Sequence, residues 1–493
     1  MADSMSTQSP SRAPQLITYA DRLAGDISGV GLLLDGPLSG AFGGVHLLPF
    51  FLPIDGADAG FDPIDHTAVD DRIGSWDDIS ALAERYAVMG DVIVNHMSAH
   101  SSAFRRWLAD PDDPTTAGLF LTPDRVFGGA PSADAVARIY RPRPTSPFTP
   151  VTFADGTERA VWTTFTSEQV DIDVEHPLGW AYLTGILDRF AASGVSIVRL
   201  DAVGYAIKRP GTSCFMLPET GDFIGRLAAA CHERDMQVLV EVHGHHLDQI
   251  EIARRVDLVY DFALPPLVLD ALYTGDASAL KRWVGIRPAN AINVLDTHDG
   301  IGVIDVGADA RDDSRIGLLP PARIHDLVEG IHARSGGTSR AATGAAATNL
   351  DLYQVNCTFY DALGRDDERY LAARMLQLLL PGIPQIYYVG LLAGVNDMAL
   401  LATTGVGRDV NRHHYSPDEV AAALQRPVVR RLLEMLRWRA GTAAFDGDFE
   451  LLDSEDHLVV VRWRSADSTV AVSVDVRRGD VTIDGDVGPA ALR

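Results

Sequence analysis

The sequence of 493 residues has little that could cross-link it or attract it to an anionic surface. Its three cysteines, Cys214, Cys231 and Cys357, are an odd number spread far apart, which argues against a disulfide framework and for a reducing compartment. Lysine occurs only as Lys208 and Lys281, and the net charge is -25 because 67 acidic side chains outnumber 42 basic ones. This charge repels phosphate backbones and anionic lipids, so neither a nucleic-acid partner nor a membrane partner is expected.

Long hydrophobic runs are also missing. The N-terminal residues are Ser-rich and lack the charged and apolar regions of a secretory signal. No apolar run reaches the ~18 residues of a membrane span. The most apolar helical stretch, Tyr370 to Leu380, contains an arginine and ends at a Pro-Gly pair. A cytoplasmic protein is therefore expected, large enough for about three domains or for one barrel with attachments.

Eight short apolar runs end in polar or acidic residues. They lie at 16–21, 43–50, 91–96, 195–203, 236–243, 258–264, 291–299 and 383–390. Unbroken runs of this kind are typical of strands that are buried on both faces, as in a parallel sheet. Apolar residues at helical spacing predict helices over 77–89 and 222–234. Eight strands alternating with helices favour an α/β fold, the (β/α)₈ TIM barrel, over an open sheet of about five to seven strands.

Two connections are too long to be simple loops. Residues 99–165 are rich in Pro, Gly and Arg, and residues 300–368 contain a Gly/Ala/Thr-rich stretch, so each is expected to be an inserted, loop-rich subdomain. After Arg437, short alternating strands split by Asp/Gly turns predict a small antiparallel β domain. The expected division is barrel over 1–98, 166–299 and 369–435, insertions over 99–165 and 300–368, and a C-terminal β domain over 436–493.

Three acidic residues stand at the ends of three predicted strands. They are Asp201, Glu241 and Asp299, and each has a basic neighbour. Because the carboxyl ends of barrel strands meet at one rim, these carboxylates are expected to converge. A single strand-end acid is more often a helix cap or a salt-bridge partner. Three of them, each with a basic neighbour, favour a catalytic site.

Paired carboxylates are suited to glycosyl transfer with retention of configuration. One attacks the anomeric carbon, while the other protonates the leaving oxygen and later deprotonates the acceptor. Arg199 lies two residues before Asp201, on the same strand face, where its guanidinium is expected to keep Asp201 ionised as a nucleophile requires. Glu241 must begin the cycle protonated.

Several stretches carry a resemblance to a known family. RLDAVGY, LVEVH, LDTHDG and DVIVNHMS resemble the four signature motifs of the α-amylase family, glycoside hydrolase family 13. Longer segments, among them ITYADRL, LDAVGYAIKRPGTSCFM, LPGIPQIYYVG and GRDVNRHHY, are similar to the sucrose phosphorylases of that family from about residue 15 to 440. The resemblance implies retaining glucosyl transfer from sucrose to inorganic phosphate. The products would be α-D-glucose 1-phosphate and D-fructose, with a covalent glucosyl-aspartate as intermediate.

Carried over residue by residue, the resemblance implies that Asp201 is the nucleophile, Glu241 the acid/base and Asp299 the stabiliser that binds sugar hydroxyls. Around the glucosyl unit it implies Asp58, Phe61, His96, Phe165, Arg199, His298 and Arg408. On the acceptor side it implies Arg143, Tyr205, His243, Asp351, Leu352, Tyr353 and Gln354. Core packing explains Phe61 and Phe165 equally well, and His96 has the alternative of a satisfied core histidine.

Phosphate capture would depend on local arginines such as Arg143, because the sequence has no Walker-type phosphate loop. No group of carboxylates and Asn in residues 99–165 has the pattern of a calcium site, so no metal or cofactor is expected. Alternatives are a sister phosphorylase acting on sucrose 6'-phosphate or glucosylglycerate, which differs chiefly in the acceptor loop, and a non-catalytic barrel that only binds. The resemblance also admits a homodimer, for which the sequence carries no signature.

Overall fold

The computed structural model describes residues 13–141, 146–309, 312, 314–344 and 354–485. Four residues implied on the acceptor side, Arg143, Asp351, Leu352 and Tyr353, lie outside these described residues. Within the described ranges, every helix is too short or too polar to cross a membrane.

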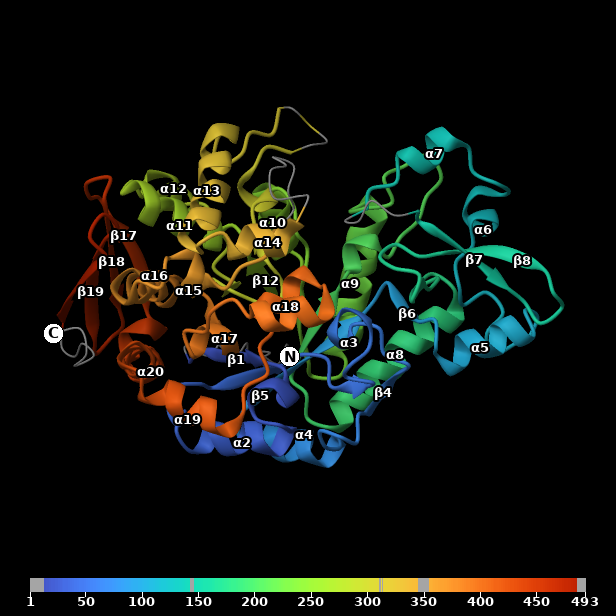
Figure 1. The fold of residues 1–493 in the computed structure, drawn as a ribbon, viewed down its shortest axis with the longest axis horizontal. Coiled ribbons are helices and arrows are strands. Elements are labelled where there is room, and N and C mark those ends of the chain that lie inside the picture. Colours follow the sequence, from blue (N-terminus) through green and yellow to red (C-terminus); the bar gives the residue numbers. More distant parts are fainter. Residues whose placement is uncertain (1–12, 142–145, 310–311, 313, 345–353, 486–493) are drawn as a thin grey trace, which may run out of the picture.

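Eight parallel strands close into a barrel. In spatial order they are β1 (Gln15–Thr18), β2 (Gly44–Leu47), β5 (Ala87–Ile93), β10 (Ile197–Asp201), β11 (Gln237–Val240), β12 (Leu258–Asp261), β13 (Ala291–Asn293) and β16 (Ile383–Tyr387). Each predicted strand run supplies one of them, so the predicted TIM barrel is confirmed. The barrel occupies the middle of the view in Figure 1.

The strand register brings the chemistry-bearing strand ends to the same level. Leu200 of β10 pairs with Val92 of β5 on one side and with Val240 of β11 on the other. All three side chains are buried, as the unbroken apolar runs predict. Asp201 and Glu241 therefore follow paired residues on neighbouring strands, and the Glu241 N–H donates to the Leu200 carbonyl over 3.3 Å.

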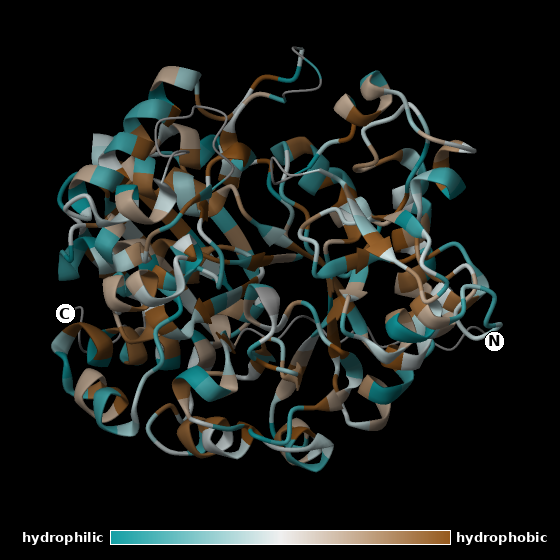
Figure 2. Ribbon diagram, turned by 45° about the vertical axis from the view of Figure 1, so that its right-hand side comes forward, coloured by the Kyte–Doolittle hydropathy of each residue, from teal (hydrophilic) through white to brown (hydrophobic). Residues whose placement is uncertain are grey.

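Helices connect and cover these strands. They are α1 (Ala20–Leu23), α2 (Ile27–Asp35), α4 (Trp76–Ala83), α8 (Pro177–Ala192), α9 (Pro218–His232), α10 (His246–Ala253), α11 (Leu264–Thr274), α12 (Ser278–Val284), α16 (Asp367–Leu379), α17 (Tyr388–Leu391), α18 (Met398–Thr404), α19 (Pro417–Gln425) and α20 (Pro427–Gly441). The prediction of one helix over 77–89 is wrong at its end. Ala87 already belongs to β5, where it pairs with Gly44 of β2, because the barrel takes up this apolar segment. Figure 2 shows hydrophobic segments concentrated inside the molecule and hydrophilic residues on its outer turns.

The chain leaves the barrel between β5 and β10. This excursion contains β6 (His96–Ser98), α5 (Ser102–Ala109), α6 (Pro123–Phe127), α7 (Ala133–Ala137), β7 (Phe148–Thr152), β8 (Glu158–Trp162) and β9 (Gln169–Asp171). β6 and β9 pair antiparallel, with His96 opposite Asp171, so the first and last strands of the excursion close onto each other. In Figure 1 the excursion lies on the right, across the barrel from the C-terminal sheet.

The connection between β13 and β16 is more helical than the sequence suggests. It contains β14 (Ile301–Gly302), α13 (Pro321–Arg334), α14 (Thr338–Thr343), β15 (Gln354–Val355), α15 (Phe359–Ala362) and α16. α13 forms because a proline starts it and because Ile324, Leu327 and Ile331 recur at helical spacing and are buried.

The C-terminal strands β17 (Asp448–Leu452), β18 (Leu458–Arg464), β19 (Thr469–Asp475) and β20 (Asp480–Gly485) form one antiparallel sheet in sequence order, which confirms the predicted β domain. The expected boundary between residues 435 and 436 falls inside α20 and is therefore misplaced. The sheet is anchored to the barrel helices, because the Trp463 indole N–H donates to the Leu379 carbonyl over 2.7 Å.

Candidate active site

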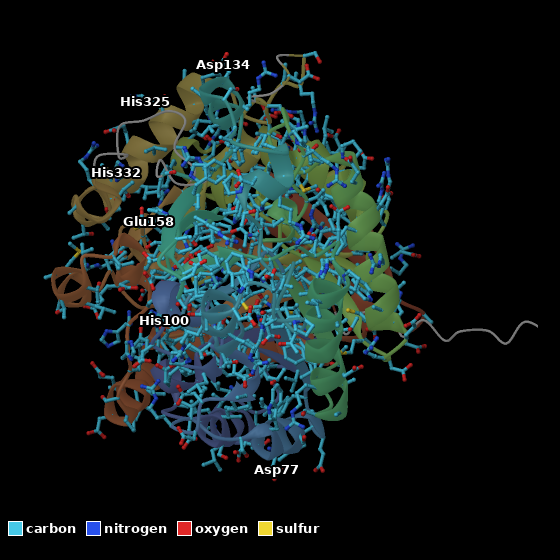
Figure 3. All side chains as sticks on the ribbon, turned by 90° about the vertical axis from the view of Figure 1, so that its right-hand side faces the viewer. Asp77, His100, Asp134, Glu158, His325 and His332 are labelled. Atoms are coloured by element: carbon cyan, nitrogen blue, oxygen red, sulfur yellow. The ribbon has the colours of Figure 1, made fainter. Side chains whose placement is uncertain are left out.

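A cavity of about 120 Å³ opens at the carboxyl ends of the barrel strands. It is lined by Asp58, Phe61, His96, Phe165, Gln169, Asp201, Ala202, Tyr205, Glu241, His298, Asp299 and Arg408. All of these except Gln169 and Ala202 are residues that the sequence singled out. By contrast, Asp77, Asp134 and His325 are exposed at the periphery of the molecule (Figure 3).

Asp201 is the last residue of β10, and its carboxylate accepts a hydrogen bond from a buried arginine. Arg199 Nη1 donates to Asp201 Oδ1 over 2.8 Å and to Asp91 Oδ1 over 2.6 Å. Asp91 in turn contacts His46 Nε2 over 3.0 Å. The period-two argument that put Arg199 on the same face as Asp201 is thus confirmed, while Asp91 and His46 were not found from the sequence.

Burial, Arg199 and Glu241 act together on the pKa of Asp201. Burial raises the pKa of the Asp201 carboxyl well above its ordinary value, the Arg199 guanidinium lowers it, and the Glu241 carboxylate raises it further. The effect expected of Arg199, which is to keep Asp201 ionised, is thus opposed by burial and by Glu241. Burial and the neighbouring Glu241 carboxylate thus favour the protonated form of Asp201.

Glu241 directly follows β11 and accepts a backbone donor. The Ala202 N–H donates to Glu241 Oε2 over 3.3 Å, and Ala202 adopts a left-handed conformation with φ of 54°. His243 Nε2 lies 3.7 Å from Glu241 Oε1. The two strand-end carboxylates, Asp201 and Glu241, thus face one cavity with different partners.

A buried carboxylate holds His243 in place. His243 Nδ1 lies 3.0 Å from Asp305 Oδ2, and the imidazole stacks on Phe262 with the ring centroids 3.8 Å apart. Although burial lowers the pKa of His243, the Asp305 carboxylate outweighs burial and raises that pKa. Asp305 was not found from the sequence. The only signal for Asp305 in the sequence is its place in the LDTHDGIGVIDVG stretch, close to Asp299.

Two arginines surround the third carboxylate. Arg408 Nη1 lies 2.9 Å from Asp299 Oδ1, and Arg412 Nη2 lies 3.7 Å from the same oxygen. The same two guanidinium groups lie 3.4 and 3.5 Å from Asp58. Burial raises the pKa of Asp299, but the Arg408 and Arg412 guanidinium groups outweigh burial and hold that pKa well below its usual range. Asp299 is therefore an anion in this site.

Aromatic rings form the sides of the cavity. Phe61 stacks on His298 with centroids 4.9 Å apart, and Phe165 meets Tyr205 edge to face at 5.1 Å. His96 lines the cavity, and its Nε2 contacts the Phe61 carbonyl oxygen over 2.9 Å. The side chain is therefore both a hydrogen-bonded buried histidine and part of the cavity wall. Burial lowers the pKa of His298 to about 3, which leaves a neutral imidazole on this wall.

Three sequence-derived residues lie next to the cavity rather than on its wall. They are Arg199, His243 and Gln354. Gln354, in β15, accepts from the Gly300 N–H over 3.3 Å, and its Nε2 lies 3.4 Å from His243 Nε2. Within the part of the chain that the structure describes, His, Cys, Asp and Glu side chains form no group of three or more arranged to hold a metal ion.

Comparison with known proteins gives concordant results over nearly the whole chain. A model of the α-amylase catalytic domain matches residues 18–215. Sucrose phosphorylase of Agrobacterium vitis is 56% identical over 470 residues, which cover 95% of this chain and 96% of that protein. Sucrose phosphorylase of Bifidobacterium adolescentis is 52% identical over 94% of this chain and 92% of that protein. The chain belongs to the sucrose phosphorylase family.

A solved structure supports the family assignment. The crystal structure of sucrose 6F-phosphate phosphorylase from Thermoanaerobacter thermosaccharolyticum superposes with a TM-score of 0.90 at 35% identity and covers 98% of both chains. The resemblance found in the signature stretches is thus confirmed as membership of the sucrose phosphorylase family. The likeness includes the excursion between β5 and β10 and the C-terminal sheet.

Proposed function

We propose that this protein transfers a glucosyl unit from sucrose to inorganic phosphate and releases α-D-glucose 1-phosphate and D-fructose. The proposal is supported by one observation above all: Asp201, Glu241 and Asp299 line a single cavity in a chain 56% identical to a sucrose phosphorylase. Carboxylates from neighbouring strand ends are the groups that a double displacement with retention requires.

In the first half of the reaction, the Asp201 carboxylate attacks the anomeric carbon of the glucosyl unit. The bond from that carbon to the fructosyl oxygen breaks, and Glu241 gives its proton to this oxygen, so fructose leaves as a neutral molecule. This step requires Glu241 to be protonated and Asp201 to be ionised. The contact of Arg199 with Asp201 favours this arrangement, since a cation beside one carboxyl draws the negative charge to it.

In the second half, a phosphate oxygen attacks the anomeric carbon from the side that fructose has left. The bond to Asp201 breaks, Glu241 takes a proton from a protonated phosphate, and the original protonation of the pair is restored. Two inversions at the same carbon give net retention. Arg143, Asp351, Leu352, Tyr353 and Gln354 remain the proposed acceptor-side residues, with Tyr205 and His243.

The remaining cavity residues have proposed roles in holding the glucosyl unit. Asp299 is kept ionised by Arg408 and can accept hydrogen bonds from sugar hydroxyls while opposing the positive charge that develops at the anomeric centre. Phe61 and Phe165 are proposed to pack against the apolar faces of the sugar. Asp58, His96, His298 and Arg408 supply donors and acceptors for the outer hydroxyls.

The proposal is tested by incubating the purified protein with sucrose and phosphate and detecting glucose 1-phosphate. Release of free glucose alone would contradict it. Rates on sucrose, sucrose 6'-phosphate and glucosylglycerate, measured side by side, separate the proposed function from the sister activities. Binding without turnover of any of the three would indicate a non-catalytic barrel.

We also propose a cytoplasmic location and activity without a metal or another cofactor. The location is supported by three buried free cysteines, Cys214, Cys231 and Cys357, which suit a reducing compartment. Activity that survives prolonged treatment with a chelator is the expected result. A homodimer is a further proposal, to be tested by light scattering of the purified protein.

A further inference from the structure

Lys208 is one of only two lysines in a chain with 42 basic side chains. It lies three residues after η1 (Val203–Tyr205), and its side chain is buried, only 2% exposed. Burying an ammonium is costly unless oxygen atoms replace its water shell, so its surroundings need an explanation.

Oxygen atoms from four separate segments replace that water shell. Lys208 Nζ donates to Asn95 Oδ1 over 2.9 Å, to Thr164 Oγ1 over 3.3 Å and to the Tyr205 carbonyl. It forms an ion pair with Asp171 Oδ2 at 2.8 Å, and that carboxylate is fully buried. These segments are the residues just after β5, the loop after β8, the strand β9 and η1, which follows β10.

Each of these oxygens belongs to a residue that lines the cavity or stands beside one that does. Tyr205 lines it directly. Asn95 precedes the wall residue His96, and Thr164 precedes the wall residue Phe165. Asp171 pairs with His96 across the β6–β9 ladder. The Lys208 ammonium therefore joins the segments that carry three side chains of the aromatic wall.

We infer that Lys208 is a positioning residue for glucosyl transfer, which fixes the wall of His96, Phe165 and Tyr205 against the barrel. This inference rests on the proposed function. Without the ammonium, the buried Asp171 carboxylate and the Asn95 carbonyl would lack their cationic donor. The segments that carry the wall would then shift until these oxygens accept hydrogen bonds from water. A small displacement of groups that hold the substrate is enough to slow the reaction strongly.

The geometry requires lysine rather than arginine. An ammonium is compact and can direct three hydrogens at oxygens converging from several sides, whereas a guanidinium is flat and presents its donors in one plane. Trp162 closes one side of the site, with its ring centroid 5.5 Å from Lys208 Nζ. A chain that uses arginine for nearly all its other cations keeps lysine at this position.

The site can also be reached by a small molecule. Lys208 lines a second cavity of about 250 Å³, which Leu121, Ala206 and Pro210 also line. If the side chain is shortened to alanine, a small primary amine entering from this cavity can place its ammonium where Nζ was.

The test compares Lys208→Ala with Lys281→Met. Lys281 Nζ donates to the Ser454 and Glu455 carbonyls, between α12 and the C-terminal domain, and is the matched control. Lys208→Ala should lower kcat/KM for sucrose about 100-fold, mainly through kcat. Lys208→Arg should show a similar loss. Ethylammonium should recover about tenfold of the loss, while tetramethylammonium, which has no N–H to donate, should recover none. Lys281→Met should stay within about twofold of the wild type.

Three results would overturn the inference. They are a folded Lys208→Ala variant with near-normal turnover, equal rescue by both amines, and full activity of Lys208→Arg. If the variants do not fold, wild-type protein carrying ¹⁵N-lysine gives a direct reading, since it has two ammonium signals. Glucose should shift the Lys208 signal and not that of Lys281, and an unshifted Lys208 signal in glucose-saturated protein would overturn the inference. Wild-type glucose 1-phosphate formation, measured in the same assay, tests the proposed function separately.

Discussion

Asp201 and Asp261 each end a barrel strand, β10 and β12, and the two carboxylates have opposite surroundings. Asp261 Oδ1 accepts from the Trp283 indole over 2.9 Å and from the Leu264 N–H at the start of α11 over 3.1 Å. Its Oδ2 accepts from Arg287 Nε over 2.6 Å, and the side chain is 1% exposed. This is the helix-capping and ion-pairing role that a strand-end acid most often has.

Among the described residues Asp201 has one side-chain donor, Arg199, and 14% of its side chain is exposed at the cavity. Its other oxygen is therefore free of fixed protein donors among the described contacts and can meet a substrate. Asp261 is saturated, because the Leu264 N–H, the Trp283 indole and the Arg287 guanidinium all donate to it. An aspartate at the end of a barrel strand is thus structural where protein donors occupy both of its oxygens. It is reactive where one oxygen has no protein donor and faces the cavity.

The largest effect should come from removing the charge of the open carboxylate. Asp201→Asn should lower kcat for sucrose phosphorolysis by about 10⁴-fold or more, because an amide cannot form the covalent intermediate. Stopped assays of glucose 1-phosphate would measure it, with circular dichroism to verify folding. The folded fraction of Asp261→Asn should keep most of the activity, and an equal loss in both variants would remove the distinction between them.

Glu241→Gln should have the next largest effect, and its size should depend on the leaving group. With sucrose we expect kcat/KM to fall about 10³-fold, since the fructosyl oxygen needs a proton as it leaves. With α-D-glucosyl fluoride, whose leaving group needs little protonation, the loss should be less than about tenfold. The ratio of the two rates is the measurement. An equal loss on both donors would contradict the acid/base role.

The saturated carboxylate should matter for stability instead. Asp261→Asn should reduce the free energy of unfolding by about 3 kcal/mol, because it leaves the buried Arg287 guanidinium without its counter-charge. Urea denaturation followed by tryptophan fluorescence would measure the change. Asp201→Asn should alter stability by less than about 1 kcal/mol, since it removes the cost of burying a carboxylate as well as the attraction to Arg199. A larger loss of stability in Asp201→Asn than in Asp261→Asn would contradict the assignment of Asp261 as the structural carboxylate.

Arg199→Gln should shift the pH dependence by a smaller amount. Arg199 lowers the pKa of Asp201, so its removal raises that pKa further. The nucleophile is active only above its pKa, and therefore the acidic limb of kcat/KM for sucrose should move to higher pH, by about one unit. Arg287→Gln, next to the saturated Asp261, is the matched variant and should leave the limb in place. An unmoved limb in Arg199→Gln would contradict the electrostatic role.

The barrel was predictable because its strands carry their own signal. Continuous apolar runs are visible without knowing the partner strand, and each of the eight runs became a strand. The helix predicted over 77–89 failed where a local helical pattern competed with pairing of Ala87 to Gly44, a contact between distant segments. The boundary at residue 436 failed because α20 continues through it.

The candidate site was predictable where residues stand at strand ends and less so where loops supply them. Asp201, Glu241 and Asp299 follow strands directly, so the fold class alone brings them to one rim. Gln169 and Arg412 reach the site from the excursion and from the loop after α18, and their sequence context did not single them out.

The sequence by itself determined the fold class, the family and the three acids at one rim, because strand periodicity and signature stretches are local properties of the chain. Only the tertiary structure decided which strand-end acid is saturated and which is open, since the donors to Asp261 come from α11, α12 and the loop that follows α12. Likewise, Lys208 meets Asn95 across 113 positions of sequence, and no local pattern encodes that contact. The closed barrel brings such distant side chains together, because each strand end lies beside segments that the chain reaches much earlier or later.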